Sequence, residues 1–195
     1  WIALNNGISY TSVNSQLTNW TESMGLRGTL QSIVRFNGSL YISSNIGVVK
    51  REKNRFIPAE NISALSNKLF IANTSDKKHS LLSATSAAVY QIIENKAYLI
   101  ENANIHSYSF VKSNIFPDIF YVALKNGVGV LNYKHSRWKF IGRLNDIEGR
   151  VYVVAEDNDG LLWYSQRYSG VGRCNVVNPY QLVTEGVVKY VDLPF

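Results

Sequence analysis

Apolar residues along the chain cluster in short runs or alternate with polar residues, and corners rich in Asn, Asp, Ser and Gly separate the runs. Such runs and alternation are typical of β-strands, whereas an amphipathic helix repeats its apolar positions every three or four residues. No stretch of the sequence shows the helical spacing. The pattern therefore predicts an all-β fold without any helix longer than two turns.

The segment Gly149–Asn175 shows this pattern most clearly. Val151–Ala155 is a β-branched and aromatic run, which predicts an inner strand covered on both faces. Asp157–Gly160 supplies residues that tolerate positive φ, and Leu161–Tyr164 resumes the apolar run, so we expect a hairpin. A third short strand, Val171–Cys174, is expected to run antiparallel to the second.

The same sequence pattern is repeated along the whole chain. An apolar pair, a small residue, a polar corner and then Gly or Ala before Val or Ile occur in five segments, whose anchor residues are spaced by 40, 41, 39 and 42 residues. A period near 40 with about four strands per unit is typical of a β-propeller blade. The anchors are Trp1, Tyr41, Leu82, Tyr121 and Trp163. We interpret the four aromatic anchors, Trp1, Tyr41, Tyr121 and Trp163, as packing between blades.

The repeat divides the chain into a partial blade at residues 1–25 and four blades at residues 28–59, 60–103, 104–145 and 148–193. In the partial blade, we expect Trp1–Leu4, Ile8–Val13 and Leu17–Thr21 to be the second, third and fourth strands. Rings of four to eight blades are known, so about 4.5 blades leave closure of the ring open.

Residues 149–164, followed by Gly170–Arg173, resemble the two-component regulator propeller repeat. In that family a strand ends in an acidic-Asp-Gly turn, followed by Leu-Trp, a short corner and Gly-Leu or Gly-Val. Asn37–Tyr41 keeps the turn, whereas Ser75–His79 lacks its glycine. The resemblance implies that this chain is an incomplete part of a seven-bladed ring.

The same resemblance implies a function. Members of that family form the extracytoplasmic, periplasmic part of membrane-anchored signalling proteins, often hybrid histidine kinases and sometimes diguanylate cyclases, and many respond to carbohydrate fragments. The expected partners are therefore a small-molecule or oligosaccharide ligand and the remaining blades of the parent chain, with a second copy of the chain as a further candidate. The alternatives are a propeller glycosidase or lyase, and an interaction scaffold of the WD type, although the sequence contains no Gly-His or Trp-Asp pair.

Composition favours a folded domain. The 195 residues are 46% hydrophobic and 17% charged, which is enough apolar content for a core. No stretch approaches the roughly 18 uninterrupted apolar residues of a membrane span. The single cysteine, Cys174, lies in an apolar run, so we interpret it as an inert buried thiol.

Candidate catalytic and metal-binding motifs are sparse. His79, His106 and His135 show no paired spacing for a metal. Asp157–Gly160 fails the calcium-loop register, which would need carboxylates where Ala155 and Gln166 stand. We expect no metal, no cofactor and no catalytic residue, although carboxylates leave a glycosidase pair open. Those carboxylates are Glu22, Glu101, Asp118 and Glu156.

Charge is unevenly distributed. The net charge of +6 includes two clusters at the expected turns between third and fourth strands, which would lie on one face near the outer rim. We do not expect nucleic acid there, because the clusters lack interleaved aromatic residues. The clusters comprise Lys50, Arg51, Lys53 and Arg55, and Lys134, His135, Arg137 and Lys139.

The corners between second and third strands are the candidate ligand site. In a propeller these corners share one face around the central channel, where polar side chains converge. A guanidinium pairs bidentately with a carboxylate or sulfate, and a phenol stacks on a sugar ring. The candidate ligand-binding residues are Asn6, Asn45, Asn126, Arg167 and Tyr168.

Overall fold

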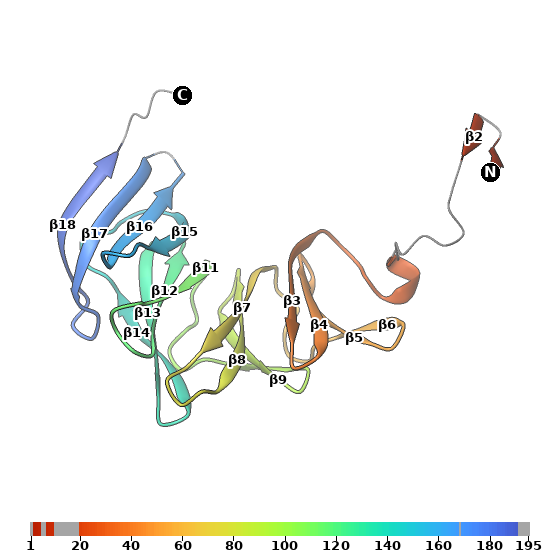
Figure 1. The fold of residues 1–195 in the computed structure, drawn as a ribbon, viewed down its shortest axis with the longest axis horizontal. Helices are drawn as coiled ribbons and strands as arrows, with labels where there is room; N and C mark the ends of the chain where they lie inside the picture. Colours follow the sequence, from red (N-terminus) through yellow and green to blue (C-terminus); the bar gives the residue numbers. More distant parts are fainter. Residues whose placement is uncertain (1, 5–6, 10–19, 168, 191–195) are drawn as a thin grey trace.

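The computed structural model describes residues 2–4, 7–9, 20–167 and 169–190. These residues form four four-stranded antiparallel sheets and one two-stranded sheet. Their only helix is a 3-10 turn at Glu22–Met24 (Figure 1). The prediction of an all-β fold without a helix longer than two turns is confirmed for the described residues.

The strands follow the repeat of the sequence, and within each sheet every strand pairs with the next one along the chain. The two-stranded sheet contains β1 (Ile2–Leu4) and β2 (Gly7–Ser9). The first and second four-stranded sheets contain β3 (Leu30–Phe36), β4 (Ser39–Ser44), β5 (Gly47–Glu52) and β6 (Arg55–Pro58), and β7 (Ser66–Asn73), β8 (His79–Thr85), β9 (Val89–Ile93) and β10 (Lys96–Leu99). The third and fourth contain β11 (Ser107–Lys112), β12 (Ile119–Leu124), β13 (Gly127–Lys134) and β14 (Arg137–Arg143), and β15 (Val151–Glu156), β16 (Leu161–Gln166), β17 (Gly170–Asn178) and β18 (Val183–Tyr190).

The four large sheets stand side by side along an arc, with the first strand of each sheet on the inside (Figure 1). The first strands β3, β7, β11 and β15 contact one another in that order. This is the arrangement of propeller blades around an axis. Within the described residues the first and fourth sheets lie at opposite ends of the arc, so the ring is open.

Apolar side chains fill the three interfaces between neighbouring sheets. Tyr41 and Leu69 lie in the cluster between the first and second sheets, and Leu82 and Phe120 lie in the cluster between the second and third. Tyr121 lies in the cluster between the third and fourth sheets and is fully buried. The expected packing between blades is confirmed for Tyr41 and Tyr121, whereas Trp1 lies outside the described residues.

Trp163 departs from that expectation. It holds the strand position equivalent to Tyr121, because it pairs with β15 as Tyr121 pairs with β11. Its ring stacks instead on Tyr190 of its own sheet, with the ring centroids 6.0 Å apart. The guanidinium of Arg173 lies 5.5 Å from the Trp163 ring. The residue lies on the outward face of the last sheet, where no further sheet stands among the described residues.

The same geometry corrects the prediction for Val151–Ala155. This segment is the first, inner strand of its sheet, as expected, but only one face is covered. Val151 and Val154 are buried, whereas Val153 is 56% exposed. The reason is the missing neighbour, since the matching first strand of the third sheet, β11, has a sheet on either side and is buried or half-buried at every position.

The start of the chain also differs from its prediction. β1 and β2 form the expected hairpin around the corner at Asn6, which itself lies outside the described residues. The strand expected at Leu17–Thr21 is absent from the described part of that range, because Trp20 and Thr21 precede the 3-10 turn without strand pairing. Trp20 packs edge-on against Phe56, with the ring centroids 5.5 Å apart.

A β-bulge recurs at the start of the first strand in all four large sheets. The register shifts by one residue against the second strand each time. A bulge turns the extra side chain out of the regular alternation. The residues skipped by the pairing are Gln31, Asn67, Tyr108 and Tyr152.

The chain between sheets covers the outer edge of the next sheet. Glu60 bridges to Lys96 on β10, and Glu101 bridges to Lys139 on β14, in each case with parallel backbone pairing. Ion pairs reinforce both contacts, with Lys–Glu distances of 3.7 Å at Glu60 and 3.0 Å at Glu101. Edge strands with unpaired backbone groups promote aggregation, and these bridges occupy part of that edge.

Candidate ligand-binding site

The strand order places the candidate corners at one end of the sheets. In a four-stranded meander, the corner between the second and third strands lies at the same end as the connection to the next sheet. Asn45 lies between β4 and β5, Asn126 between β12 and β13, and Arg167 between β16 and β17. Asn6 and Tyr168 lie outside the described residues.

Two of the candidate residues come together in one hollow. It has a volume of about 540 Å³ and lies between the corner of the third sheet, the connection to the fourth and the corner of the fourth. Asn126 and Arg167 both line it. The remaining lining residues are Lys125, Glu148, Gly149, Arg150, Gln166, Ser169 and Lys189.

Asn45 belongs to the first sheet and does not line this hollow. Its side-chain oxygen accepts a hydrogen bond from the Thr29 backbone N–H at 2.8 Å, and its own N–H donates to the Thr29 carbonyl at 3.1 Å. These two bonds tie the corner to the segment that enters the sheet. The structure thus gives Asn45 a local structural contact.

Close backbone contact joins the corner to the connecting segment at the hollow. The Gly127 N–H donates to the Gly149 carbonyl at 2.6 Å. Gly127 has φ +106°, and an added Cβ would overlap the Ile147 carbonyl oxygen. A side chain at position 127 would therefore separate the corner from the connection and open the wall of the hollow.

The hollow carries a strong excess of positive charge. Four of its lining residues are cationic, namely Lys125, Arg150, Arg167 and Lys189, and Glu148 is the one carboxylate. A concave surface lined by one sign of charge concentrates field lines and attracts ligands of the opposite sign. The charge favours an anionic ligand.

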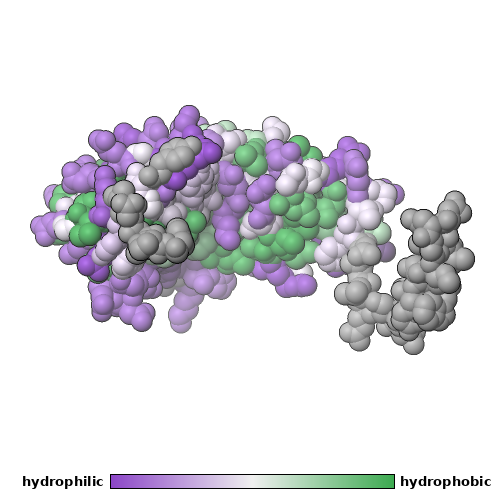
Figure 2. Space-filling model, turned by 90° about the horizontal axis from the view of Figure 1, so that it is seen from above, coloured by the Kyte–Doolittle hydropathy of each residue, from purple (hydrophilic) through white to green (hydrophobic). Residues whose placement is uncertain are grey.

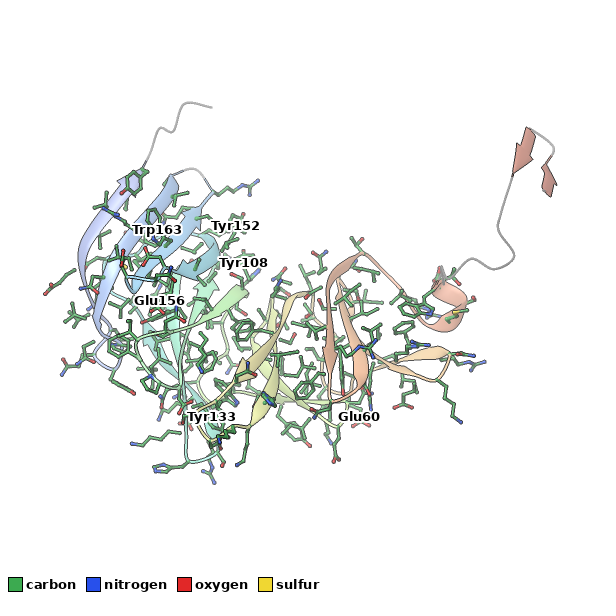
Figure 3. The ribbon with its side chains drawn as sticks, in the orientation of Figure 1. Glu60, Tyr108, Tyr133, Tyr152, Glu156 and Trp163 are labelled. Carbon is green, nitrogen blue, oxygen red and sulfur yellow. The ribbon has the colours of Figure 1, made fainter. Side chains whose placement is uncertain are left out.

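Aromatic rings of the inner strands adjoin these cations. Tyr108 and Tyr152, two of the bulged residues, lie side by side with ring centroids 4.9 Å apart (Figure 3). The His106 ring lies 4.6 Å from the Tyr108 ring. The Arg150 guanidinium donates a hydrogen bond to the Tyr152 hydroxyl at 3.4 Å. The bulges thus bring two phenols from neighbouring sheets to the same end as the basic hollow.

The arginines perturb the ionisation of all three rings. Burial lowers the pKa of His106, and the charges of Lys125 and Arg150 lower it further. Burial raises the pKa of Tyr108, against the opposing effect of Arg150 and Arg167. The hydrogen bond from Arg150, with the charge of Arg167, lowers the pKa of Tyr152. At neutral pH the imidazole is uncharged, and the positive charge of the site comes from lysine and arginine.

A second hollow of about 820 Å³ adjoins the first and shares Asn126, Glu148 and Gly149 with it. The Arg143 guanidinium donates to the Asn126 carbonyl at 3.0 Å. Through these shared residues the two hollows adjoin each other across the third and fourth sheets. Seen from above, apolar residues gather in a band over the middle of the molecule, and hydrophilic residues prevail toward its ends (Figure 2).

Sequence reasoning missed most of this site. It named the Lys125-Asn126 corner and Arg167, but it treated Tyr108 and Tyr152 as strand residues and did not single out Arg150. No composition signal marks them. The alignment of the repeats offers one clue, because Tyr108 and Tyr152 both stand one residue after the start of a first strand.

The carboxylates left open for a glycosidase pair are engaged elsewhere. Asp118 accepts hydrogen bonds from the Ser75 backbone N–H at 2.7 Å and from the Ser75 hydroxyl. Glu156 accepts from the Ser113 hydroxyl at 2.9 Å and from the Asn114 N–H. Both join the hairpin of one sheet to the next sheet. Glu101 pairs with Lys139, and Glu22 pairs with Arg27.

The other candidate groups behave as structural elements. Cys174 is buried in the apolar cluster of the last interface, and burial raises the pKa of its thiol to about 11. Among the described residues, no three His, Cys, Asp or Glu side chains gather as metal ligands. The two basic clusters lie at the β5–β6 and β13–β14 hairpins, as the sequence predicts.

The chain was compared with known proteins. No family model and no curated protein sequence matches it. Among solved structures, it is similar to the extracellular domain of BT3049 from B. thetaiotaomicron, described as a hybrid two component system, with a TM-score of 0.65 and 14% identity over 89% of this chain and 26% of that one. The extracellular domain of BT4673 from the same organism, described as a one component system, gives a TM-score of 0.59 and 14% identity over 84% and 25%.

A further similar structure is an ancestral GH74 enzyme, with a TM-score of 0.51 and 18% identity over 75% of this chain and 22% of that one. The chain spans about a quarter of the length of the extracellular domains that it matches. At these identities the likeness shows the fold alone. None of the described residues belongs to a helix long and apolar enough to cross a membrane. The chain therefore has an open, propeller-like fold of four-stranded antiparallel sheets, like extracellular domains of two-component system proteins.

Proposed function

We propose that this chain is part of a ligand-sensing, non-catalytic β-propeller of the two-component regulator propeller family, in the extracytoplasmic region of a membrane-anchored signal-transduction protein. The observation that carries the proposal is the hollow between the third and fourth sheets, which is lined by four cationic side chains and one carboxylate. The likeness to extracellular domains of two-component systems supports the sensor role.

The ligand that fits this site is an anionic carbohydrate, such as a uronic-acid or sulfated oligosaccharide. Arg150 and Arg167 offer guanidinium groups, which pair with planar carboxylates and sulfates through two parallel hydrogen bonds. Tyr108 and Tyr152 offer aromatic surface next to those groups. An acidic sugar presents both an anionic group and an apolar ring face, so it uses both features of the site.

Catalysis fits the geometry less well. A glycosidase needs two carboxyl groups flanking the scissile bond, at separations of roughly 5–10 Å. The hollow contains Glu148 alone. Asp118 and Glu156, on the other hand, hold hairpins of neighbouring sheets. We therefore assign the site to binding.

Calorimetric titration of the full chain with trigalacturonate, a sulfated disaccharide and neutral maltotriose tests the proposal. We expect the two acidic ligands to bind and maltotriose not to bind. Arg167→Ala should weaken binding by roughly ten-fold to a hundred-fold, because a hydrogen bond between charged groups contributes about 1.5–3 kcal/mol.

Arg137→Ala is the matched control, since it removes the same charge from an exposed position at the opposite end of the sheets. It should leave the dissociation constant unchanged. Equal binding of maltotriose, or an unchanged dissociation constant in Arg167→Ala with folding intact, would contradict the proposal.

A further inference from the structure

A small basic hollow lies on the outward face of the first sheet, and the second sheet separates it from the candidate site (Figure 1). Its volume is about 200 Å³. Three of its lining residues are cationic, and none of them carries a carboxylate. The lining residues are Arg35, Gly38, Ser39, Leu40, Arg51 and Lys53. We name this site the first-sheet hollow.

Strand pairing places both arginines on the same face of the sheet. Arg35 pairs with Leu40, and Arg51 pairs with Phe56. Residues that pair directly across strands project from the same face. Leu40 and Phe56 belong to the apolar cluster that Trp20 packs against, so this face points away from the second sheet. The hollow lies at the end of this face, beside the β3–β4 and β5–β6 turns.

Hydrogen bonds to these two turns hold both guanidinium groups in position. Arg35 donates to the Gly38 carbonyl at 3.4 Å, and Arg51 donates through its Nε to the Lys53 carbonyl at 3.0 Å. The Arg51 guanidinium also lies 4.8 Å from the Trp20 ring. A guanidinium carries five N–H donors, so each arginine keeps further donors for a ligand. The hollow therefore presents positioned donors to a bound group.

The part of the chain that builds this hollow carries most of the net charge. Residues 1–59 contain six cationic side chains and two carboxylates, a net charge of +4, whereas residues 60–195 contain fourteen and twelve, a net charge of +2. Residues 1–21 contain no charged side chain, so the segment before the sheet supplies no carboxylate there. The three cations of the hollow form no ion pair with any residue that the structure describes.

The nearby carboxylates do not neutralise the hollow. Both carboxylates of the first 59 residues are ion-paired, Glu22 with Arg27 at 3.8 Å and Glu52 with Lys50 at 3.7 Å. Glu52 directly follows an arginine of the hollow along β5, and successive side chains of a strand point to opposite faces. Glu52 therefore lies on the face toward the second sheet, and Glu94, in the β9–β10 turn, belongs to that second sheet. Neither of them lines the hollow.

We propose that the first-sheet hollow binds a tetrahedral oxyanion group, namely a sulfate or phosphate, either as the free ion or as an ester. Its volume is below the roughly 300 Å³ of pockets that take drug-sized ligands, so it fits one such group. Two guanidinium groups and an ammonium group donate to several oxygens at once, which suits a tetrahedral dianion, whereas one guanidinium suffices for a planar carboxylate. No residue of this hollow lines the candidate site, so the inference is independent of the proposed function.

Nuclear magnetic resonance titration of the full chain tests the inference. The probes are inorganic sulfate, inorganic phosphate and acetate, at constant ionic strength. We expect saturable shifts of the Gly38, Ser39 and Lys53 N–H signals with sulfate and phosphate, and about ten-fold weaker binding of acetate, which lacks the further oxygens. The N–H signals of Gly149 and Ser169 report the candidate site separately.

Sugar esters identify the source of the oxyanion. Glucose 6-sulfate and glucose 6-phosphate are titrated in the same way, with glucose as the neutral control. Tighter binding of one ester than of the free ions identifies that ester as the ligand class, and equal or weaker binding of both identifies the free ion. Glucose should cause no shift at the hollow. Shifts with glucose that match those of its esters would overturn recognition of the anionic group.

Substitution of one arginine separates the hollow from general charge attraction. Arg35→Gln should weaken sulfate binding about ten-fold or more, because it removes a hydrogen bond between charged groups. Arg55→Gln is the matched control, since Arg55 is exposed on the same sheet, pairs with Glu52 and does not line the hollow. It should leave the dissociation constant unchanged.

Three results would overturn the assignment. Equal weakening in Arg35→Gln and Arg55→Gln would show attraction by net charge alone. Absence of saturable shifts at the hollow would exclude the site, and acetate binding as tightly as sulfate would exclude a preference for the tetrahedral group. Lys53→Gln provides a second variant, which should also weaken sulfate binding, and circular dichroism melts confirm that each variant is folded.

Discussion

The first and fourth sheets, at the two ends of the arc, differ in how much of their outward face is covered by other residues. At the first sheet, the preceding segment covers part of that face, because Trp20 and Leu26 pack against the cluster of Ile42, Val49 and Phe56, while Ile33 on the same face stays 58% exposed. The Arg51 guanidinium also lies 4.8 Å from the Trp20 ring. At the fourth sheet the corresponding face stays open, and it exposes Val153, Val177 and Val188 by 56, 44 and 39%.

This contrast shows that residues at equivalent repeat positions contribute differently to the stability of the fold. Tyr121 and Trp163 occupy the same place in their sheets, but Tyr121 is fully buried against the next sheet, and Trp163 is only partly covered by Tyr190 and Arg173. Burial of an aromatic side chain stabilises a fold in proportion to the area removed from water. A blade of this kind is therefore stabilised mainly by its neighbour.

The largest expected effect compares these two aromatic residues directly. Tyr121→Ala should lower the free energy of unfolding by about 3–5 kcal/mol, because it leaves a cavity in a filled interface. Trp163→Ala should cost only about 1–2 kcal/mol, since its ring is already partly exposed. Urea unfolding of both variants measures the difference. Equal costs would show that a further surface covers the fourth sheet.

The second prediction removes the cover of the first sheet. Trp20→Ala should lower the free energy of unfolding by about 2 kcal/mol, through loss of the contacts with Phe56 and Arg51. Trp20→Phe should recover part of that loss, because a smaller ring still reaches the apolar cluster. Thermal unfolding gives the measurement. A Trp20→Ala variant as stable as the unmodified chain would show that this segment does not cover the sheet in solution.

The third prediction concerns association through the open face. Exposed apolar surface on a sheet promotes self-association, so the isolated chain should form dimers or larger species in sedimentation experiments. Val153→Lys should weaken association at least ten-fold, because it places a charge within the contact. Ile93→Lys, at an exposed position of the second sheet, is the matched control. Equal effects of the two substitutions would contradict a role for the open face.

The smallest effect is a pH dependence at the same face. The Trp163 indole N–H donates to the Asp157 carboxylate at 2.6 Å, and this bond, together with the backbone N–H groups of Leu161 and Asp159, lowers the pKa of Asp157. Its stabilisation should be present above the unfolded pKa of about 3.9 and should disappear as the pH falls through the lower folded value. Urea midpoints between neutral and acidic pH measure it. Asp157→Asn should lack this component, and an identical pH profile in that variant would contradict the assignment.

Much of the fold was predictable from the sequence, because local chemistry specifies strands and turns. The runs of β-branched residues and the Asn, Asp and Gly corners identified four four-stranded units. Asp157 illustrates why, since it accepts hydrogen bonds from the Asp159 and Leu161 N–H groups within its own turn. Such contacts reach only two to four residues along the chain, so the sequence pattern contains them.

The candidate site was predictable only in part. The expectation that corners between second and third strands share one face placed Asn126 and Arg167 at the same end, and the structure brings both to one hollow. Tyr108 and Tyr152 were not predicted, because they lie in strands rather than corners, and a one-residue bulge decides where their side chains point. The pairing register that creates a bulge depends on the neighbouring strand, and no pattern within a single strand reveals it.

The sequence by itself determined the repeat, the strand order within each unit and the polar character of the corners, because these follow from short-range backbone preferences. Only the tertiary structure decided which apolar faces are covered. Val122 and Val153 lie in similar β-branched and aromatic runs, but Val122 is buried between two sheets and Val153 faces outward on the last sheet. Burial depends on the presence of a neighbour about 40 residues away, and local sequence carries no information about that neighbour.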